Sequence, residues 1–525
     1  MNHVVRTSSG PVSGIRPDAV GGVDGRCIVR FLGIPFAAPP VGTARWRRPE
    51  PPEPWAAVRP CTDFGPVSPQ NPSPLETMLG VGTRPMSEDC LSLNVWTPAC
   101  DDQGRAVLVW VHGGGFAAGT GSVAWYDGSR LATVGDVVVV TVNYRLGALG
   151  WLHLEHLLGA EFAGSGNLGL LDQMAALGWV RDNIAGFGGD PGRVTVFGES
   201  AGAMSIGALL GAPAAAGLFA GAIAQSGAAH TYLPTETASW VTEELLTELG
   251  LSSAGADALL DLPIDALLAA QQAIIGRLLK ASPPEQGRAS GTFSLPFQPV
   301  LDDTVLSRPP LEAVRAGTAA GIRILVGSTT EEWNLFHLVE RTIQPMTEDG
   351  LARRCVRLLD PANGDGAGAA ALDLYRRNRP GASLDDVWVA VATDWVFRIP
   401  ALRLAEAQAV HQRATWLYEF SFRSTAWGGG LGACHALEVP FVFDNLHQSG
   451  VELFVGPLTD GARRLATVTS LAWLAFARSG APGHGDLPDW PAYAPGRRAT
   501  MELGDPCALH DDPHGDERAL WDDVL

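Results

Sequence analysis

Two short stretches of the chain are almost wholly apolar and have the length of β-strands. Residues 106–111 read Ala-Val-Leu-Val-Trp-Val, and residues 137–142 read Val-Val-Val-Val-Thr-Val. Continuous apolar runs of this kind are typical of strands that are covered on both faces, as in a parallel sheet. Shorter runs of similar character predict further strands at residues 4–7, 29–32, 193–197 and 322–326.

A different periodicity marks residues 167–184. Apolar side chains recur there at spacings of four, three, three and four, which predicts an amphipathic helix: Leu170, Met174, Leu177, Val180 and Ile184. The mixed apolar and polar stretches at about 236–288 and 347–411 predict two further helical regions. Strands that alternate with helices favour an α/β fold with a large, mainly parallel central sheet and helices on both faces.

One uncharged stretch, residues 206–224, is long enough to raise the question of a membrane span. It consists mostly of Ala and Gly, and Pro213 interrupts it, so we interpret it as a helix, a turn and a second helix in a buried core. No secretory signal is evident at the N-terminus, where a long apolar core is missing. We therefore expect no membrane association, and a cytoplasmic protein.

Composition narrows the possible partners and cofactors. The 525 residues carry 37 Lys and Arg against 56 Asp and Glu, a net charge of −19, which would repel nucleic acid. Lys280 is the only lysine and lies in no phosphate-binding or Schiff-base context, and the abundant Arg, Ala, Gly and Pro suggest a GC-rich bacterial genome. The seven cysteines include no Cys-x-x-Cys pair, so neither a metal site nor a disulfide scaffold is indicated.

The sequence Gly198-Glu199-Ser200-Ala201-Gly202 lies between a predicted strand and a predicted helix. In that context Gly-x-Ser-x-Gly is typical of a nucleophile elbow, a sharp turn that presents the serine hydroxyl above the sheet. The alternative is a structural turn that happens to contain a serine. The elbow also places Ser200 beside the N-terminus of the following helix, where backbone N–H groups are free.

The second motif, His112-Gly113-Gly114-Gly115-Phe116, directly follows the strand that ends at Val111. Consecutive glycines let the backbone approach a ligand closely, and such loops supply N–H donors to an oxyanion in lipases and esterases. We expect the donors to be the N–H groups of Gly114, Gly115 and Ala201. A flexible glycine loop without this role is the alternative.

Longer motifs resemble one family. Residues 87–98 (Ser-Glu-Asp-Cys-Leu-Ser-Leu-Asn-Val-Trp-Thr-Pro) and the elbow region at 187–203 closely resemble the two signatures of the type-B carboxylesterases. Residues 32–42 and Gln225-Ser226-Gly227 resemble other blocks of that family, and the resemblance covers nearly the whole chain. It implies a single α/β-hydrolase domain over residues 1–525, in which the helical regions surround an active-site gorge.

The resemblance also implies a Ser-Glu-His triad. It puts the nucleophile at Ser200, the acid at Glu332 in the turn after the strand at 322–326, and the base at His435 in the Gly-rich loop at 428–435. Glu331, next to Glu332, is the other candidate for the acid of the triad. The remaining alternative is that both are solvated carboxylates of a turn with no catalytic role. His112 is expected to pack behind the glycine loop.

Three more residues match family positions around the triad. Ser226 and Glu438 correspond to a buried polar network, and Glu199 would face the gorge. We expect all three to support the triad without reacting themselves.

The sequence departs from the family at two positions. The usual disulfide partner of Cys90 is replaced by Ser68, although Cys61 is nearby, so whether Cys61 and Cys90 pair is left open. The tryptophan that binds choline in cholinesterases is replaced by Gly80, which disfavours cholinesterase activity.

We therefore expect a serine hydrolase that cleaves short-to-medium acyl or aryl carboxylic esters through an acyl-enzyme on Ser200. Its partner is a small-molecule ester, it needs no metal or organic cofactor, and it is a monomer or a weak homo-oligomer. The alternatives are a carbamate or amide hydrolase with the same triad and a non-catalytic, cholinesterase-like binding protein.

Overall fold

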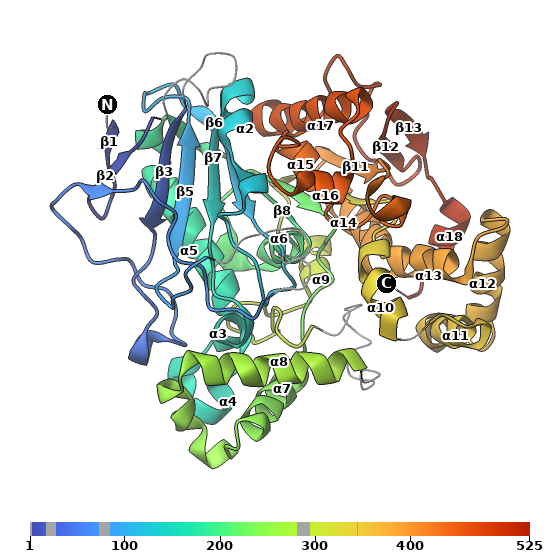
Figure 1. The fold of residues 1–525 in the computed structure, drawn as a ribbon, viewed down its shortest axis with the longest axis horizontal. Helices are drawn as coiled ribbons and strands as arrows, with labels where there is room; N and C mark the ends of the chain where they lie inside the picture. Colours follow the sequence, from blue (N-terminus) through green and yellow to red (C-terminus); the bar gives the residue numbers. More distant parts are fainter. Residues whose placement is uncertain (1–2, 17–27, 73–83, 281–294, 344, 525) are drawn as a thin grey trace.

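The computed structural model describes residues 3–16, 28–72, 84–280, 295–343 and 345–524. Its centre is a ten-stranded sheet (Figure 1) with the strand order β13-β12-β11-β10-β9-β8-β6-β7-β5-β3. The strands are β3 (Val29–Pro35), β5 (Ser92–Thr97), β6 (Arg105–Val111), β7 (Val138–Val142), β8 (Gly189–Glu199), β9 (Gly221–Gln225), β10 (Arg323–Thr329), β11 (Thr415–Phe420), β12 (Ala499–Leu503) and β13 (Ala508–Asp511). All pairs from β7 to β12 are parallel, and the pairs nearer the two edges are antiparallel.

A smaller sheet lies at the N-terminal side. It contains β1 (His3–Arg6), β2 (Pro11–Gly14) and β4 (Arg59–Pro60). The strand predicted at residues 4–7 is therefore real, but it belongs to this sheet and not to the central one.

Side chains of the central strands alternate between two apolar cores. Along β6, Val107, Val109 and Val111 enter one core, whereas Leu108 and Trp110 enter the other. The first core is covered by α5 (Leu168–Asn183), α6 (Ala201–Gly211), α9 (Pro310–Arg315) and α14 (Ile399–Ala409). The second is covered by α2 (Ser129–Gly135), α15 (Val439–Val442) and α17 (Asp460–Ser479). Burial on both faces explains the unbroken apolar runs, and the α/β-hydrolase prediction is confirmed.

Two groups of helices project from this body (Figure 1). One contains α7 (Thr235–Glu248) and α8 (Ile264–Lys280), and the other contains α11 (Glu348–Asn363), α12 (Ala367–Asn378) and α13 (Leu384–Thr393). Both predicted helical regions are thus present as far as the structure describes them, since residues 281–288 lie outside the described part. The shorter helices are α3 (Gly147–Trp151), α4 (Glu155–Leu158), α10 (Asn334–Ile343), α16 (Val451–Val455) and α18 (Gly515–Ala519). That the whole chain is one domain stays a prediction.

The helix-turn-helix prediction for residues 206–224 is wrong in its second half. Helix α6 ends at Gly211, and the chain then makes a short turn and enters strand β9, which is buried throughout. Pairing with β8 on one side and β10 on the other determines this outcome. Two full ladders of backbone hydrogen bonds outweigh the helix propensity of alanine, which is only a weak local preference.

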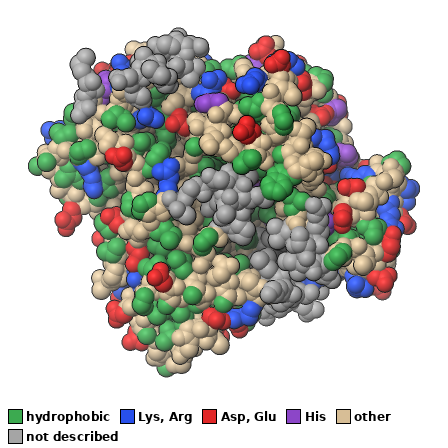
Figure 2. Space-filling view, viewed as in Figure 1, with side chains coloured by type: hydrophobic (Ala, Val, Ile, Leu, Met, Phe, Trp, Pro, Cys, Tyr) green, Lys and Arg blue, Asp and Glu red, His purple; other side chains and the backbone are tan. Residues whose placement is uncertain are grey.

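The described helices include none that is long and apolar enough to cross a membrane. Figure 2 shows acidic and basic side chains interspersed with apolar ones across one face of the molecule. The six described cysteines, Cys61 and Cys90 among them, are free. Gly80, at the family's choline-binding position, lies outside the described residues.

Candidate active site

The predicted nucleophile lies in the sharp turn between β8 and α6. Ser200 has φ 55° and ψ −125°, a left-handed conformation that costs energy for any residue with a side chain. A Cβ atom at Gly202 would lie 2.1 Å from the carbonyl oxygen of Val111, and one at Gly198 would lie 2.6 Å from the same atom. The turn packs so closely on β6 that only glycine fits on either side of Ser200, which accounts for the Gly-x-Ser-x-Gly pattern.

The predicted acid and base are in contact. Nδ1 of His435 lies 2.6 Å from Oε2 of Glu332, and both side chains are buried. The backbone N–H of Thr329, the last residue of β10, donates to the other oxygen of Glu332 at 2.7 Å. A carboxylate in this place accepts a hydrogen bond from the Nδ1–H group. Nε2 is therefore the ring nitrogen that can accept a proton.

Glu331, the rival for the acid, points elsewhere. Its carboxylate pairs with Arg423 and accepts the backbone N–H of Ala433 at 2.9 Å. It therefore holds the loop that carries His435, whereas Glu332 contacts the ring itself.

A second carboxylate reaches the other side of the ring. Oε1 of Glu199 lies 3.0 Å from Nε2 of His435. Burial alone would lower the pKa of His435, but the negative charges of Glu199 and Glu332 outweigh it and hold the pKa well above its ordinary value. The free site therefore favours an imidazolium between two carboxylates.

Glu438 is a third carboxyl group in this cluster, and it is fully buried. The hydroxyl of Ser226 donates to its Oε1 at 3.2 Å. Burial, followed by the charges of Glu332 and Glu199, raises the pKa of Glu438 to about 8. Glu438 is therefore largely protonated at neutral pH, which relieves the repulsion among the three carboxyl groups.

The loop at residues 112–119, here called the glycine loop, lies against the elbow. A Cβ atom at Gly113 would come within 3.0 Å of the Cβ of Ser200. The carbonyl oxygen of Gly114 accepts the N–H groups of Ala117 and Ala118 at 3.2 and 3.0 Å, which closes the loop into a tight turn. Ala201 opens α6, and the first N–H groups of a helix have no partner within it. The predicted donor positions thus lie in segments that meet at Ser200.

His112 packs behind this loop, as expected. Its Nδ1 lies 2.8 Å from the carbonyl oxygen of Gly113, and its ring stacks on Tyr144 with centroids 4.4 Å apart. The hydroxyl of Tyr144 donates to the carbonyl oxygen of His112 at 2.7 Å. Burial lowers the pKa of His112 to about 4, so it is neutral and serves as packing.

Sequence reasoning missed an aromatic wall beside His435. The rings of Phe336 and Phe397 lie 5.1 and 4.7 Å from the imidazole, centroid to centroid. Phe397 belongs to a π-helical turn, Asp394–Arg398, and such turns are often found at functional sites. Nothing in the local sequence pattern indicates the contact, because these residues come from separate elements.

Side chains from distant segments hold the π-helical turn in place. The hydroxyl of Tyr375 donates to Asp394 at 2.5 Å, and the indole N–H of Trp521 donates to the Tyr375 oxygen at 2.9 Å. Arg398 forms a buried ion pair with Asp394. Through these hydrogen bonds, the wall beside His435 is connected to Trp521, near the C-terminal end of the described residues.

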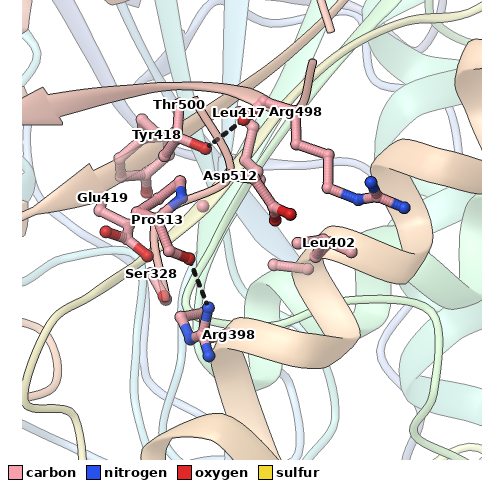
Figure 3. A pocket seen from close by; sticks show the side chains of 12 residues that line it. Ser328, Arg398, Leu402, Leu417, Tyr418, Glu419, Arg498, Thr500, Asp512 and Pro513 are labelled. Atoms are coloured by element: carbon pink, nitrogen blue, oxygen red, sulfur yellow. Dashed lines mark hydrogen bonds between the residues drawn. The ribbon is translucent and has the colours of Figure 1, made fainter. Parts of the chain in front are cut away.

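A small cavity lies near this turn (Figure 3). Its lining includes Arg398, Glu419 and Asp512, and Arg398 donates there to the carbonyl oxygen of Pro513 at 3.2 Å. None of the described residues that line this cavity is a predicted site residue. We therefore do not assign the ester site to it.

Fold and site together define an α/β hydrolase. Residues 1–521 match the model of the carboxylesterase family. The chain is 39% identical to the para-nitrobenzyl esterase of Bacillus subtilis (strain 168) over 521 residues, which cover 99% of this chain and 98% of that protein. It is 35% identical to the phenmedipham hydrolase of Pseudarthrobacter oxydans, covering 96% and 95% of the two chains.

The solved structure of carboxylesterase EST55 from Geobacillus stearothermophilus at pH 6.2 is also similar. It aligns with a TM-score of 0.85 and 41% identity over 99% of both chains. The chain therefore belongs to the carboxylesterase family and is a carboxylic ester hydrolase.

Proposed function

We propose that Ser200 is the nucleophile of this hydrolase, with His435 as its general base and Glu332 as the group that orients the base. His435 accepts the hydroxyl proton through Nε2 while the oxygen of Ser200 attacks the ester carbonyl. The N–H groups of Gly114, Gly115 and Ala201 stabilise the oxyanion that forms. His435 then returns the proton to the leaving alcohol, and water repeats the cycle to release the acid.

The observation that carries this proposal is the 2.6 Å contact between His435 and Glu332, two buried residues from different loops. Such a contact fixes the tautomer of the base, and Ser200 lies in a strained turn of the kind that presents a nucleophile above the sheet. Glu199, Ser226 and Glu438 belong to the proposal as supporting residues, because they set the charge around the imidazole.

We propose short-to-medium acyl esters and aryl esters as substrates. The aromatic wall of Phe336 and Phe397 beside His435 favours an apolar substrate group. The relative from Bacillus subtilis is named for a para-nitrobenzyl ester, which is in line with this choice. Steady-state rates on p-nitrophenyl esters of increasing acyl length test it, and a preference for long acyl chains would contradict it.

Carbamate hydrolysis is the second candidate. It rests on the 35% identity to a protein named as a hydrolase of phenmedipham, which is a carbamate. The same nucleophile, base and oxyanion donors would serve, because only the atom next to the carbonyl differs. Steady-state rates on aryl carbamates, measured beside those on matched esters, test this candidate. Rapid turnover of the carbamates supports it, and slow decarbamylation of the enzyme contradicts it.

The decisive experiment uses Ser200→Ala. We expect it to lower kcat by about 10⁶-fold, because the members of a triad act as a unit. It should also abolish covalent labelling by a sulfonyl fluoride. Mass spectrometry that finds the label on another serine in the wild-type protein would contradict the assignment.

We further propose that the protein acts in a bacterial cytoplasm as a monomer or a weak homo-oligomer. Free thiols at Cys61 and Cys90 support a reducing compartment, where disulfides rarely form. Fractionation of the source cells and sedimentation velocity over a concentration series test both statements.

A further inference from the structure

The side chain of Gln70 makes two hydrogen bonds to a single residue at the end of the glycine loop. Its Oε1 accepts the backbone N–H of Gly119 at 2.7 Å, and its Nε2 donates to the carbonyl oxygen of Gly119 at 3.0 Å. The same Nε2 donates to the carbonyl oxygen of Ser68 at 3.0 Å. The amide therefore faces one donor and two acceptors, and only one orientation of its oxygen and nitrogen satisfies all three.

Gly119, the last residue of the glycine loop, has no room to move toward the start of that loop. Its φ is +108°, and a Cβ atom there would lie 2.3 Å from the carbonyl oxygen of Gly113 and 2.5 Å from Nδ1 of His112. The backbone of Gly119 thus packs directly on the first two residues of the glycine loop. Any shift of Gly119 is transmitted to Gly113, which itself packs on Ser200.

The far flank of the loop is fixed by a different contact. The N–H of Gly147 donates to the carbonyl oxygen of Phe116 at 2.7 Å. The donors proposed at Gly114 and Gly115 lie between this contact at Phe116 and Gly113, against which Gly119 packs. Gln70, which holds Gly119, is therefore the side chain that fixes the other end of the segment that carries them.

We propose that Gln70 is a positioning residue for the oxyanion hole, which holds the N–H groups of Gly114 and Gly115 in place through its paired hydrogen bonds to Gly119. This inference rests on the proposed function, because it assumes that these two N–H groups stabilise the oxyanion. Gln70 acts through Gly119 and does not touch the substrate.

The expected effect lies in the transition state and not in substrate binding. A misplacement of catalytic groups by about 1 Å can cost about 100-fold in rate, and removal of one oxyanion donor costs about 10² to 10³. We expect Gln70→Met, which keeps the size and removes all three bonds, to lower kcat by about 10-fold to 100-fold with little change in KM. Gln70→Glu keeps the acceptor for the Gly119 N–H but places a carboxylate oxygen against two carbonyl oxygens, so it should be at least as harmful.

The matched control is Gln408→Met. The Gln408 amide also donates to two backbone carbonyl oxygens, those of Ala319 and Ile322, at 2.8 and 2.6 Å, but it lies on α14. This variant should lose stability while kcat per active site stays near the wild-type value. Active sites are counted in every variant by titration with a sulfonyl fluoride, so that unfolded protein does not enter the rates.

The probe is a trifluoromethyl ketone. The oxygen of Ser200 adds to its carbonyl carbon, the hydroxyl proton passes to His435, and the ketone oxygen becomes an oxyanion. We expect the inhibition constant of the ketone to rise in the Gln70 variants by the same factor by which kcat/KM falls. Unchanged ketone affinity and kcat in both Gln70 variants, or an equal loss in Gln408→Met, would overturn the inference. Failure of the ketone to inhibit the wild-type enzyme would instead overturn the proposed nucleophile, and this inference with it.

Discussion

Oε1 of Glu199 lies 3.0 Å from Nε2 of His435. Nε2 is also the nitrogen that must accept the proton of Ser200 in the proposed mechanism, so Glu199 contacts the same ring nitrogen that the nucleophile would use. The carboxylate stabilises the charged imidazole, and the charged imidazole is the inactive form of a general base. In the proposed mechanism, catalysis therefore begins with the loss of a proton from this pair.

The pH profile should report that proton. The charges of Glu199 and Glu332 raise the pKa of His435 in spite of burial, and the base works only when it is neutral. We expect kcat/KM to rise with pH, with its midpoint above the ordinary histidine value of about 6.5. In Glu199→Gln the midpoint should move to lower pH, because one of the two charges that raise the pKa is gone. A profile that keeps the same midpoint in this variant would show that Glu199 does not set the protonation of the base.

Glu332 and Glu331 should differ sharply in their effect on turnover. Glu332→Gln keeps the size but favours the wrong tautomer of His435, and an analogous change in a serine protease costs about 10⁴ in kcat. Glu331→Gln weakens an ion pair with the exposed Arg423, and such pairs contribute at most about 1 kcal/mol, or about fivefold in rate. Parallel kcat measurements on both variants check this, and the reverse order of effects would move the acid to Glu331.

Glu438 should make the stability depend on pH. Its pKa is about 8 in the folded protein and near 4.3 in the unfolded chain, so the unfolded state binds fewer protons between these values. The stabilisation is complete below about pH 4.3 and is lost as the pH rises toward 8, by up to about 1.4 kcal/mol for each pH unit. Glu438→Gln removes this dependence. Urea unfolding of both proteins between pH 5 and 9 checks it, and equal slopes would show that Glu438 titrates normally.

A disulfide can be restored at the family's usual position. Ser68 hydrogen-bonds to the buried thiol of Cys90, so Ser68→Cys would place two thiols side by side. We expect oxidised Ser68→Cys to be more stable than its reduced form by about 3 kcal/mol, the chain-entropy value for a loop of this length. Thermal unfolding with and without a reductant measures the difference. In the wild-type protein a reductant should change nothing, and a stability loss on reduction would reveal a bond between native cysteines.

Much of the fold followed from local patterns. The strands that contain Val107–Val111 and Val194–Phe197 were predictable because both of their faces are buried, which leaves Thr195 as the only polar residue in these two runs. The elbow and the glycine loop were predictable because each needs glycine where another backbone approaches closely. Strand β9 was not, because its Ala and Gly residues have little strand preference and become a strand only through pairing with β8 and β10.

The charges around His435 were harder to predict than the triad itself. A motif places Glu199 next to Ser200, but only the packed structure shows that its carboxylate reaches Nε2 of His435. The aromatic wall depends on a π-helical turn. Tertiary contacts of Asp394 with Tyr375, and of Tyr375 with Trp521, hold this turn in place. Such contacts join segments that are far apart in the chain, and no local pattern encodes them.

The hydrogen bond from Trp521 to Tyr375 has a consequence for the order in which the protein forms on the ribosome. Tyr375 holds Asp394, and the turn of Asp394 carries Phe397 against the ring of His435. All residues of the proposed triad precede Trp521 in the chain, so they are translated while the wall that supports the base is still incomplete. The proposed site is therefore finished late in synthesis, and a nascent chain released before Trp521 would carry every residue of the proposed triad without the packing that fixes them.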